Sequence, residues 1–451
     1  MTAPHARWVA NVSEYPAREP AAVHRPSTVS DVAGLVAGRP AGSPRLRTVS
    51  TGRNWGLGSA ATGDEDVCVA DLSGLTGIRH IDTELGFAVI EAGVTQAILS
   101  EALAETPWYL NCTASSAHTS VLGNIMDRGV GIRHQRTEDL LGLEVVLGDG
   151  EVSSIGWWPG KRGKAPNRYG VGPSMLQVFT QANFAIATAA VVQLQPRPEH
   201  RAILTFTVDE SRYADLLLEL RDLVRQQFVS GVVKVYDPVS TDLYGGSKAQ
   251  VTSHLAVEGT RAVVAAKRAE IESRLGELGA TFAERASVEA DSLAHAVTNL
   301  YGGDVSRSED IVRAALSAPT KRADAEGTGW IFSLPFVPFT VHDVTQARKI
   351  VLDVADQHGL SIGTTVNVLS HNVIDLVVAI SFDRRTQSER AHRALEALTD
   401  RFVDAGYHPY RLDISRNRSD TVTADAEAAL LADLHRVIDP HGVFAPSRYT
   451  R

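Results

Sequence analysis

The sequence predicts an α+β protein of two domains, and three observations support this prediction. A chain of 451 residues is too long for one ordinary domain. In its first part, short strand-like runs, glycine-rich turns and short helical patterns follow one another without the regular strand–helix alternation of a parallel βαβ fold. From about residue 200, strand-like runs alternate with amphipathic helical patterns, which predicts an antiparallel sheet with helices on one face.

Local signals place the elements of the first part. Asp31 opens a helical pattern in which Val32, Leu35 and Val36 share one face. The run RLRTVS predicts a strand that enters a glycine-rich turn, TGRNWGLGSA, at residues 51–60. The runs DVCVADLSGL and FAVIEAGVT predict two more strands, and QAILSEALAE predicts a helix.

The middle and second parts show equally clear patterns. LGLEVVLGDGEVSSIG predicts a hairpin whose turn is Asp149-Gly150. MLQVFTQANFAIATAAVVQLQPRPE predicts a helix and then a strand that stops at Pro196. Later strands are predicted at RAILTFTVD, GVVKVYD, GWIFSLPFV and VIDLVVAISFD, with a helix at TQARKIVLDVADQHG. The polar segment GGDVSRSEDIVRAALSAPTKRADAEGTG is expected to be partly loop.

Composition excludes several classes of protein. A formal charge of −9 leaves no basic face for nucleic acid. Two scattered cysteines, Cys68 and Cys112, provide neither a disulfide framework nor a metal cage. The first twenty residues lack the apolar core of a signal peptide, and no apolar run is long enough to span a membrane. A cytoplasmic enzyme without a membrane partner is therefore expected.

The turn at residues 51–60 has the features of an anion-binding loop. Gly52, Gly56 and Gly58 supply conformational freedom, and Asn54 tolerates a left-handed backbone. Successive backbone N–H groups in such a loop form a concave site that suits a pyrophosphate. The spacing matches neither the dinucleotide-binding fingerprint nor the P-loop. Taken alone, the turn is equally compatible with a plain tight loop.

A second glycine-rich block, TSVLGNIMDRGVG, surrounds an acidic residue. Gly123, Gly129 and Gly131 flank Asp127 and Arg128, so backbone can approach a flat ligand closely. An isolated Asp–Arg pair is usually a weak surface ion pair. An aspartate held among glycines in an apolar stretch is a better candidate for an acid or a base.

Several segments together resemble the FAD-binding domain of the vanillyl-alcohol oxidase and p-cresol methylhydroxylase (PCMH) family. They are PSTVSDVAGLV, STGRNWGLGSA, VIEAGVTQ, TSVLGNIMDRGVG, GLEVVLGDGEV and YGVGPSMLQVFTQANFAIAT, followed near the C-terminus by FDRRTQSERAHRALEALTDRFVDAGYHPYR and LHRVIDPHGVFAPSRY. The resemblance covers nearly the whole chain apart from roughly residues 230–325. It implies a two-part PCMH-type FAD-binding domain at residues 1–200, an α+β cap domain at 201–414 and a return to the first domain at 415–451.

The resemblance also implies which residues hold FAD. The pyrophosphate would be wrapped by Ser50, Thr51, Gly52, Arg53, Asn54, Gly58 and Ser59. The ribityl chain and ring would lie along Thr119, Ser120, Gly123, Asn124 and Gly131. The backbone of Ile186 would pair with the adenine or ring side, and Arg448 would lie near the pyrimidine edge, where a positive group stabilises reduced flavin.

Candidate catalytic residues follow from the same resemblance at three positions, and from the residue type alone at a fourth, His134. Asp127 matches the residue beside the reactive flavin nitrogen, where it tunes the redox reaction or takes a proton. Tyr410 and Arg411 match a pair that stabilises a substrate phenolate, although a structural pair at a strand end is the alternative. His134 is either an acid/base group or a solvated loop histidine.

The sequence departs from the family at points that bear on flavin attachment and substrate. Leu376 stands where the family's flavin-linking histidine would be, and His371, five residues away, should face the other side of the strand. We therefore expect non-covalent FAD, with a cap-domain tyrosine link as the alternative. The polar stretch IRHQRTEDL replaces a tyrosine-rich one, which argues against a simple 4-alkylphenol substrate.

The expected function is that of an FAD-dependent oxidoreductase acting on a small or medium organic substrate, phenolic or enolisable, in bacterial specialised metabolism. Gly52 holds the place at which a small residue admits oxygen, which favours an oxidase that uses O2. The alternative is a non-redox cyclisation or rearrangement on the same fold, and a binding protein without flavin is a third reading. Dimers are common for this fold, so a homodimer is one expected assembly.

Overall fold

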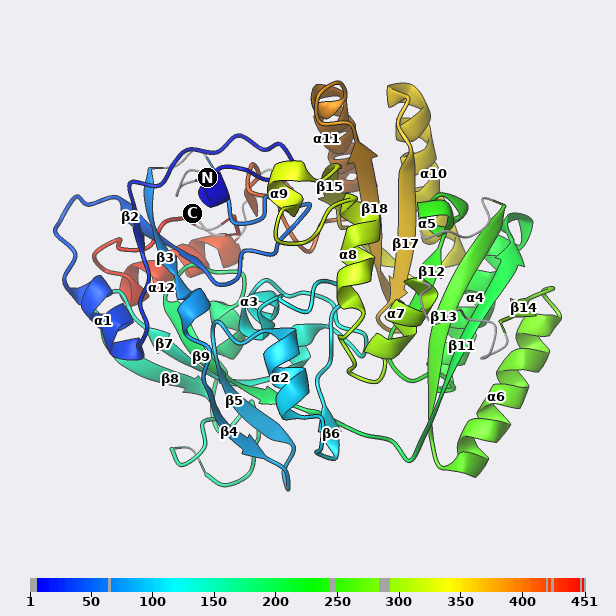
Figure 1. Ribbon diagram of the computed structural model, residues 1–451, viewed down its shortest axis with the longest axis horizontal. Helices are drawn as coiled ribbons and strands as arrows, with labels where there is room; N and C mark the ends of the chain where they lie inside the picture. The colour runs from blue at the N-terminus through cyan, green and yellow to red at the C-terminus, as the bar shows by residue number, and fades with distance from the viewer. Residues whose placement is uncertain are drawn as a thin grey trace.

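The computed structural model describes two lobes joined along a central boundary (Figure 1). The first lobe contains the N-terminal elements, and the C-terminal segment returns to it. The second lobe is built on a large sheet flanked by helices. The described residues are 6–63, 66–161, 163–243, 249–283, 293–418, 421–422, 426–446 and 448–449.

A small parallel sheet opens the first lobe. Its strand order is β1-β3-β2, with the fully buried strand β3 in the centre. Helix α1 begins in a capping box, in which Thr28 and Asp31 satisfy each other's backbone N–H groups. The C-terminal segment runs beside β2, since the N–H of Leu46 donates to the carbonyl of Val443. The elements are β1 (Ala22–His24), α1 (Val29–Ala37), β2 (Arg45–Val49) and β3 (Val67–Asp71).

A five-stranded antiparallel sheet forms the rest of the first lobe, in the order β4-β5-β9-β7-β8. The predicted hairpin is confirmed, since β7 and β8 pair across the turn at Asp149-Gly150. Two short helices cover one face. The strands of this sheet are β4 (Ile78–Asp82), β5 (Phe87–Glu91), β7 (Leu140–Val146), β8 (Val152–Gly156) and β9 (Ile186–Gln193), and the helices are α2 (Gln96–Ala102) and α3 (Val121–Met126). A separate two-stranded sheet pairs β6 (Trp108–Tyr109) with β10 (Gln195–Pro196).

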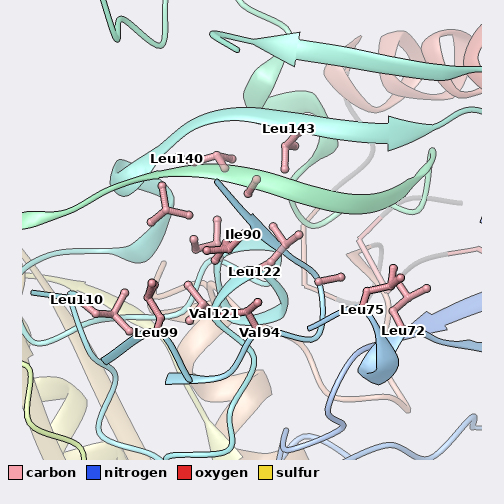
Figure 2. Packing of buried hydrophobic residues seen from close by; sticks show 14 of the residues in the cluster. Leu72, Leu75, Ile90, Val94, Leu99, Leu110, Val121, Leu122, Leu140 and Leu143 are labelled. Atoms are coloured by element: carbon pink, nitrogen blue, oxygen red, sulfur yellow. The ribbon is translucent and has the colours of Figure 1, made fainter. Parts of the chain in front are cut away.

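The core of the first lobe lies between this sheet and the helices α2 and α3. Leu99 of α2 and Leu122 of α3 lie in one cluster with Ile90, Leu140 and Leu143 from the strands (Figure 2). Alternation along each strand sends one set of apolar side chains into this cluster and the other set to the opposite face, where two tryptophans cover it. The core therefore fixes where α3 begins and ends.

The second lobe is an antiparallel sheet in the order β14-β11-β13-β12-β17-β18-β15, with β16 also paired to β18. Helices α4, α6, α10 and α11 cover one face (Figure 1), which confirms the predicted arrangement. The strands are β11 (His200–Asp209), β12 (Val233–Tyr236), β13 (Gln250–Gly259), β14 (Thr281–Phe282), β15 (Gly329–Ser333), β16 (Phe336–Pro338), β17 (Ile362–Val368) and β18 (Val373–Phe382). The helices are α4 (Tyr213–Arg225), α5 (Pro238–Leu243), α6 (Arg261–Gly276), α10 (Val341–His358) and α11 (Ser388–Asp404).

The polar segment that was expected to be partly loop contains two helices, α8 (Ser308–Leu316) and α9 (Ala323–Glu326), after α7 (Leu293–Leu300). Helix α8 lies between the lobes (Figure 1) because it is amphipathic and buries Ile311 and Val312. Its Glu309 accepts hydrogen bonds from the first lobe, from the hydroxyl of Ser116 at 2.5 Å and the N–H of Ala117 at 2.8 Å. The segment therefore ties the second lobe to the first.

One predicted helix is shorter than expected, and the last helix returns to the first lobe. The helix predicted at MLQVFTQ is only a short 3-10 turn, Leu176–Phe179, because strand β9 takes up the following apolar run. The last helix, α12 (Ala426–Ile438), lies in the first lobe (Figure 1). Among the described helices, none has the length and apolar character needed to cross a membrane.

Replacing Ile90 by alanine tests the core of the first lobe. Ile90 is fully buried, so Ile90→Ala removes apolar contacts and leaves a cavity, which should cost about 2–5 kcal/mol of unfolding free energy. Urea unfolding followed by tryptophan fluorescence measures the loss. The control, Val152→Ala, alters a side chain that is 42% exposed, so it should change stability by less than about 0.5 kcal/mol. Equal losses in the two variants would contradict this placement of the core.

Candidate functional site

Two cavities lie next to each other, one in the first lobe and the other between the lobes. The first cavity, about 280 Å³, lies in the first lobe, and the second, about 220 Å³, lies between the second sheet, helix α8 and the first lobe. They meet at a shared wall, because five residues line both: Arg53, Asn54, Thr119, Asn124 and Arg411. A ligand that fills the first cavity would therefore contact a ligand that fills the second.

Most of the residues predicted to hold a cofactor line the first cavity. They come from the turn after β2, from the start of α3 and from the C-terminal return, three segments far apart in the sequence. Those found there are Ser50, Thr51, Gly52, Arg53, Asn54, Ser59, Thr119, Ser120, Gly123, Asn124, Asp127 and Arg448.

The turn after β2 needs glycine at Gly52. Its backbone has φ +67°, and a Cβ there would lie 2.6 Å from the Cβ of Ala60. Ser59, with φ +54°, takes a left-handed conformation that had been considered for Asn54. The Ser59 hydroxyl donates to Asp324 of α9 at 2.5 Å, so this side chain is already engaged by the second lobe.

Helix α3 brings backbone rather than hydroxyl groups to the first cavity. The Ser120 hydroxyl caps the helix, accepting from the N–H of Gly123 at 2.8 Å, and donates to the carbonyl of Ala92 at 2.7 Å. Asn124, one residue further, lines both cavities, and its buried Oδ1 has no hydrogen-bond partner within the described chain. An amide in that position suits a ligand with a hydrogen-bond donor.

Three predicted cofactor positions fall outside the first cavity. Gly58 is not among its lining residues, Gly131 lines the second cavity, and the side chain of Ile186 is fully buried in the core of the first lobe. The neighbours Ala185 and Ala187 do line the first cavity, so the backbone at Ile186 runs close to it.

Asp127 is held as an anion. Arg411 donates to its Oδ2 through Nε at 2.9 Å and also through Nη2, and the Tyr449 hydroxyl donates to Oδ1 at 2.9 Å. Burial would raise the pKa of Asp127, but the positive charges of Arg411 and Arg448 outweigh burial and lower it below the usual value. A carboxylate fixed in this way positions Arg411, and of the two roles expected for Asp127, tuning the redox reaction and taking a proton, the lowered pKa favours the first.

The second cavity contains a row of hydrogen-bonded polar side chains across the sheet. The Lys234 ammonium donates to Asn367 Oδ1 at 2.6 Å, and Asn367 Nδ2 donates to Asp375 Oδ2 at 3.0 Å. The Tyr410 hydroxyl donates to the same Asp375 oxygen at 3.3 Å. Lys234 pairs with Asn367, and Asn367 with Asp375, on adjacent strands, so the three side chains share one face.

Burial disfavours the charged forms of Asp375 and Lys234. It therefore shifts their pKa values opposite to the shifts that the two groups produce on each other as an ion pair. It raises the pKa of Asp375 to about 6, against the lowering effects of Asn367 and of the Lys234 charge. It lowers the pKa of Lys234 to about 8, which the charge of Asp375 only partly offsets. Both groups therefore change charge close to neutral pH.

Aromatic side chains form other parts of the second cavity. Trp330 and Phe332 line it, and Tyr410 stacks on Phe336 with ring centroids 4.5 Å apart and an angle of 7° between the rings. A cavity with aromatic walls and one convergent polar row suits a flat aromatic molecule that carries oxygen substituents.

His134 does not belong to the site, which corrects the expectation that it is catalytic. It lines neither cavity. The N–H of Gly131 donates to the His134 carbonyl and closes a turn, and the His134 Nε2 contacts Asp139 Oδ1 at 2.7 Å. Burial lowers the pKa of His134, but Asp139 outweighs burial and raises it above the usual value. The alternative of a loop histidine fits better, because His134 lies in a bend with its side chain 29% exposed.

The placement of Leu376 also needs correction. Leu376 is fully buried in the core beneath the helices of the second lobe, while its neighbours Asp375 and Val377 line the second cavity. Alternation along β18 sends successive side chains to opposite faces, so Leu376 does not face the second cavity. His371 lies in an exposed turn, with its carbonyl bonded to Arg221. The described lining of both cavities contains neither histidine nor cysteine.

Lys234, Asn367 and Asp375 were missed by sequence reasoning. Lys234 and Asp375 are the charged residues of the otherwise uncharged strands β12 and β18, in VKVY and VIDLVVAISF, and Asn367 lies in IGTTVNV, beside two threonines. A charged residue in the middle of a buried strand is rarely tolerated without a partner. That signal was present in the sequence and could have found two of the three.

Known proteins resemble this chain in sequence along most of its length. The FAD binding domain family matches residues 20–156. The chain is 28% identical to 1'-carboxy-chondrochloren decarboxylase of Chondromyces crocatus, over 95% of this chain and 90% of that protein. It is 27% identical to the 4-cresol dehydrogenase (hydroxylating) flavoprotein subunit of Pseudomonas putida, over 96% of this chain and 88% of that protein.

Solved structures show the same fold. p-Cresol methylhydroxylase with substrate bound superposes with a TM-score of 0.81 at 23% identity, covering 98% of this chain and 91% of that one. The isoeugenol complex of 4-ethylphenol oxidase from Gulosibacter chungangensis gives 0.80 at 20% identity, covering 97% and 90%. Together with the site described above, these matches confirm the resemblance: the chain is an FAD-binding, FAD-dependent enzyme that has the fold of p-cresol methylhydroxylase and is similar in sequence to flavoproteins of that type over most of its length.

Proposed function

We propose that this enzyme is an oxidoreductase that binds FAD in the first cavity and oxidises a hydroxylated aromatic substrate in the second. The observation that carries the proposal is the shared wall, where Asn54, Asn124 and Arg411 line both cavities. A flavin ring at this wall would face the aromatic and polar lining of the second cavity. Residues 1–200 with 415–451 would then serve as the FAD domain, and 201–414 as the cap.

The residues of the first cavity fit FAD. The turn at residues 50–54 would surround the pyrophosphate with backbone N–H groups, and the unpaired Oδ1 of Asn124 would accept from the ring. Arg448, whose Nη1 donates to the carbonyl of Leu412 at 2.5 Å, would place positive charge near the pyrimidine edge. Bound FAD supplies the acceptor for a hydride.

Tyr410 and Arg411 support a substrate with an ionisable hydroxyl group. Arg411 is a fixed cation at the shared wall, and Tyr410 presents its ring and hydroxyl to the second cavity. The names of two relatives, 4-cresol dehydrogenase and 4-ethylphenol oxidase, point to phenols. We further propose O2 as the electron acceptor, which the resemblance at Gly52 favours.

Decarboxylation of a carboxylated phenol is a second candidate. The relative from Chondromyces crocatus is named as a decarboxylase. Lys234 is a buried cation that lines the second cavity, where it could attract a substrate carboxylate. Release of CO2 from a carboxylated substrate, absent with its methyl ester, would favour this candidate.

Of residues 132–140, the polar stretch that argued against a simple 4-alkylphenol, only Ile132 lines the second cavity, so this stretch does not exclude such a substrate. Anaerobic mixing of the purified holoenzyme with 4-ethylphenol tests the redox proposal. The visible flavin absorbance should fall, because the substrate passes a hydride to FAD, and admitting air should restore it with formation of hydrogen peroxide. The control is 4-ethylanisole, which has no ionisable hydroxyl and should leave the flavin oxidised. Unchanged absorbance with 4-ethylphenol and with other 4-alkylated phenols would contradict oxidation of this substrate class.

Gly52→Ala should weaken FAD binding. The new Cβ would lie 2.6 Å from Ala60 Cβ in a turn with φ +67°, so the turn must shift away from the pyrophosphate. The ratio of flavin to protein absorbance measures the loss, expected to be at least about tenfold in affinity. Gly42→Ala is the matched control: it has φ +80° but nothing within 4 Å of its Cβ. Equal flavin content in the two variants would count against this role of the turn.

FAD should be released when the holoenzyme is precipitated with acid. The described lining contains no histidine or cysteine, so the yellow colour should remain in the supernatant. Tyrosines do line the cavities, among them Tyr236 and Tyr449, and a yellow pellet would identify one of them as a covalent link.

A further inference from the structure

Asp375 combines deep burial with an unused acceptor. Its side chain is 1% exposed, and its Oδ2 accepts from both Asn367 and Tyr410. Its Oδ1 is buried and has no hydrogen-bond partner within the described chain, although the residue lines the second cavity. A buried carboxylate oxygen without a donor costs free energy, and a ligand with a donor would remove that cost.

A nearby aspartate shows how the fold treats a carboxylate that only supports structure. Asp237 is also buried, but it accepts from the N–H of Ser240 at 2.8 Å and from both the N–H and the hydroxyl of Thr364. Every oxygen of Asp237 is engaged, whereas one oxygen of Asp375 is left open beside the cavity. The difference marks Asp375 as a ligand-binding group.

We propose that Asp375 is a catalytic residue that accepts the proton of the substrate's aromatic hydroxyl group at its Oδ1, with Lys234 acting through Asn367 as a positioning residue. The proposal rests on the proposed function and deepens it by assigning the proton acceptor. The O–H bond of the substrate breaks, a new O–H bond forms on Asp375, and the electron pair stays on the substrate oxygen. The hydride leaves separately, to bound FAD.

The charges around Asp375 suit this exchange. Lys234 faces it through Asn367 from β12, Tyr410 and Arg411 approach from the segment after α11, and the neutral His254 lies beyond Lys234 on β13. Asp127 is neutralised by Arg411. An oxygen anion left on the substrate would be stabilised by the Lys234 ammonium and by Arg411.

The pH dependence follows from the pKa values of the row. Asp375 accepts a proton only when ionised, so kcat/KM should rise as the pH increases through about 6, the pKa of Asp375. His254 is the other group that ordinarily titrates in this range, but burial and the Lys234 charge lower its pKa to about 4. A rise in kcat/KM near pH 6 therefore reports the ionisation of Asp375 and not that of His254.

Binding of 4-nitrophenol to the oxidised holoenzyme tests the proton transfer without turnover. The wild-type enzyme should bind it as the yellow phenolate even below the pH at which free 4-nitrophenol ionises. Asp375→Asn keeps the shape but removes the base, so it should bind the neutral phenol and lose the phenolate absorbance. Phenolate absorbance of wild-type strength in Asp375→Asn, with normal flavin content, would overturn the proposal.

Steady-state kinetics with 4-ethylphenol give the second measurement. Asp375→Asn should lower kcat/KM by at least about a hundredfold and remove the acid limb, within the range of general base catalysis. Lys234→Met removes a neighbouring cation, so the pKa of Asp375 should rise and the limb should move to higher pH. His254→Gln, the matched control from the same sheet, should leave the limb in place. An acid limb that shifts in His254→Gln but is unchanged in Asp375→Asn would contradict the assignment of the proton to Asp375.

These outcomes also separate the proposal from the function on which it rests. Ionisation of 4-nitrophenol by the wild type, lost in Asp375→Asn, supports the proton acceptor even when no tested phenol reduces the flavin. Flavin reduction by phenols together with an unchanged acid limb in Asp375→Asn supports the function and overturns the proton acceptor. If Asp375→Asn does not retain FAD, the pH shift expected for Lys234→Met decides, and no shift would overturn the proposal.

Discussion

The ion pair between Arg411 and Asp127 joins the parts of this enzyme on which the site depends. Arg411 comes from the segment after α11, Asp127 ends helix α3, and the same guanidinium donates to Asn54 Oδ1 in the glycine-rich turn at 2.7 Å. Three segments far apart in the sequence therefore meet at one buried charge. Because removing one partner of such a pair leaves an unpaired buried charge, each segment depends on the other two for its position.

The secondary structure and the cofactor could largely be predicted from the sequence. Strands with clear alternation and turns such as Asp149-Gly150 carry local signals, and each glycine-rich block proposed to hold FAD is contiguous in the chain. The second cavity could not be predicted in the same way. Asn367 and Asp375 lie eight residues apart on the consecutive strands β17 and β18, but Lys234 joins them only through the pairing of β12 with β17, across 133 residues of sequence.

The correction at Leu376 has a structural origin. A family match assigns a residue to a position, but the direction of its side chain depends on the register of a turn or a strand. A difference of one residue on β18 exchanges core for cavity.

The burial of Asp375 also has an energetic meaning. Its carboxyl has a raised pKa, so the folded state binds the proton more tightly than the unfolded state does. Stability therefore falls as the pH rises from the usual aspartate range through about 6.

Strand β18 shows how such an enzyme could acquire new substrates. Asp375, Val377 and Ala379 line the second cavity, while Leu376, Val378 and Ile380 pack beneath the cap helices. One face of a single strand thus bears on selectivity and the other on folding. Mutations at alternate codons of β18 could change the lining of the second cavity without changing the core. Substrate selectivity and folding can therefore evolve almost independently along one strand.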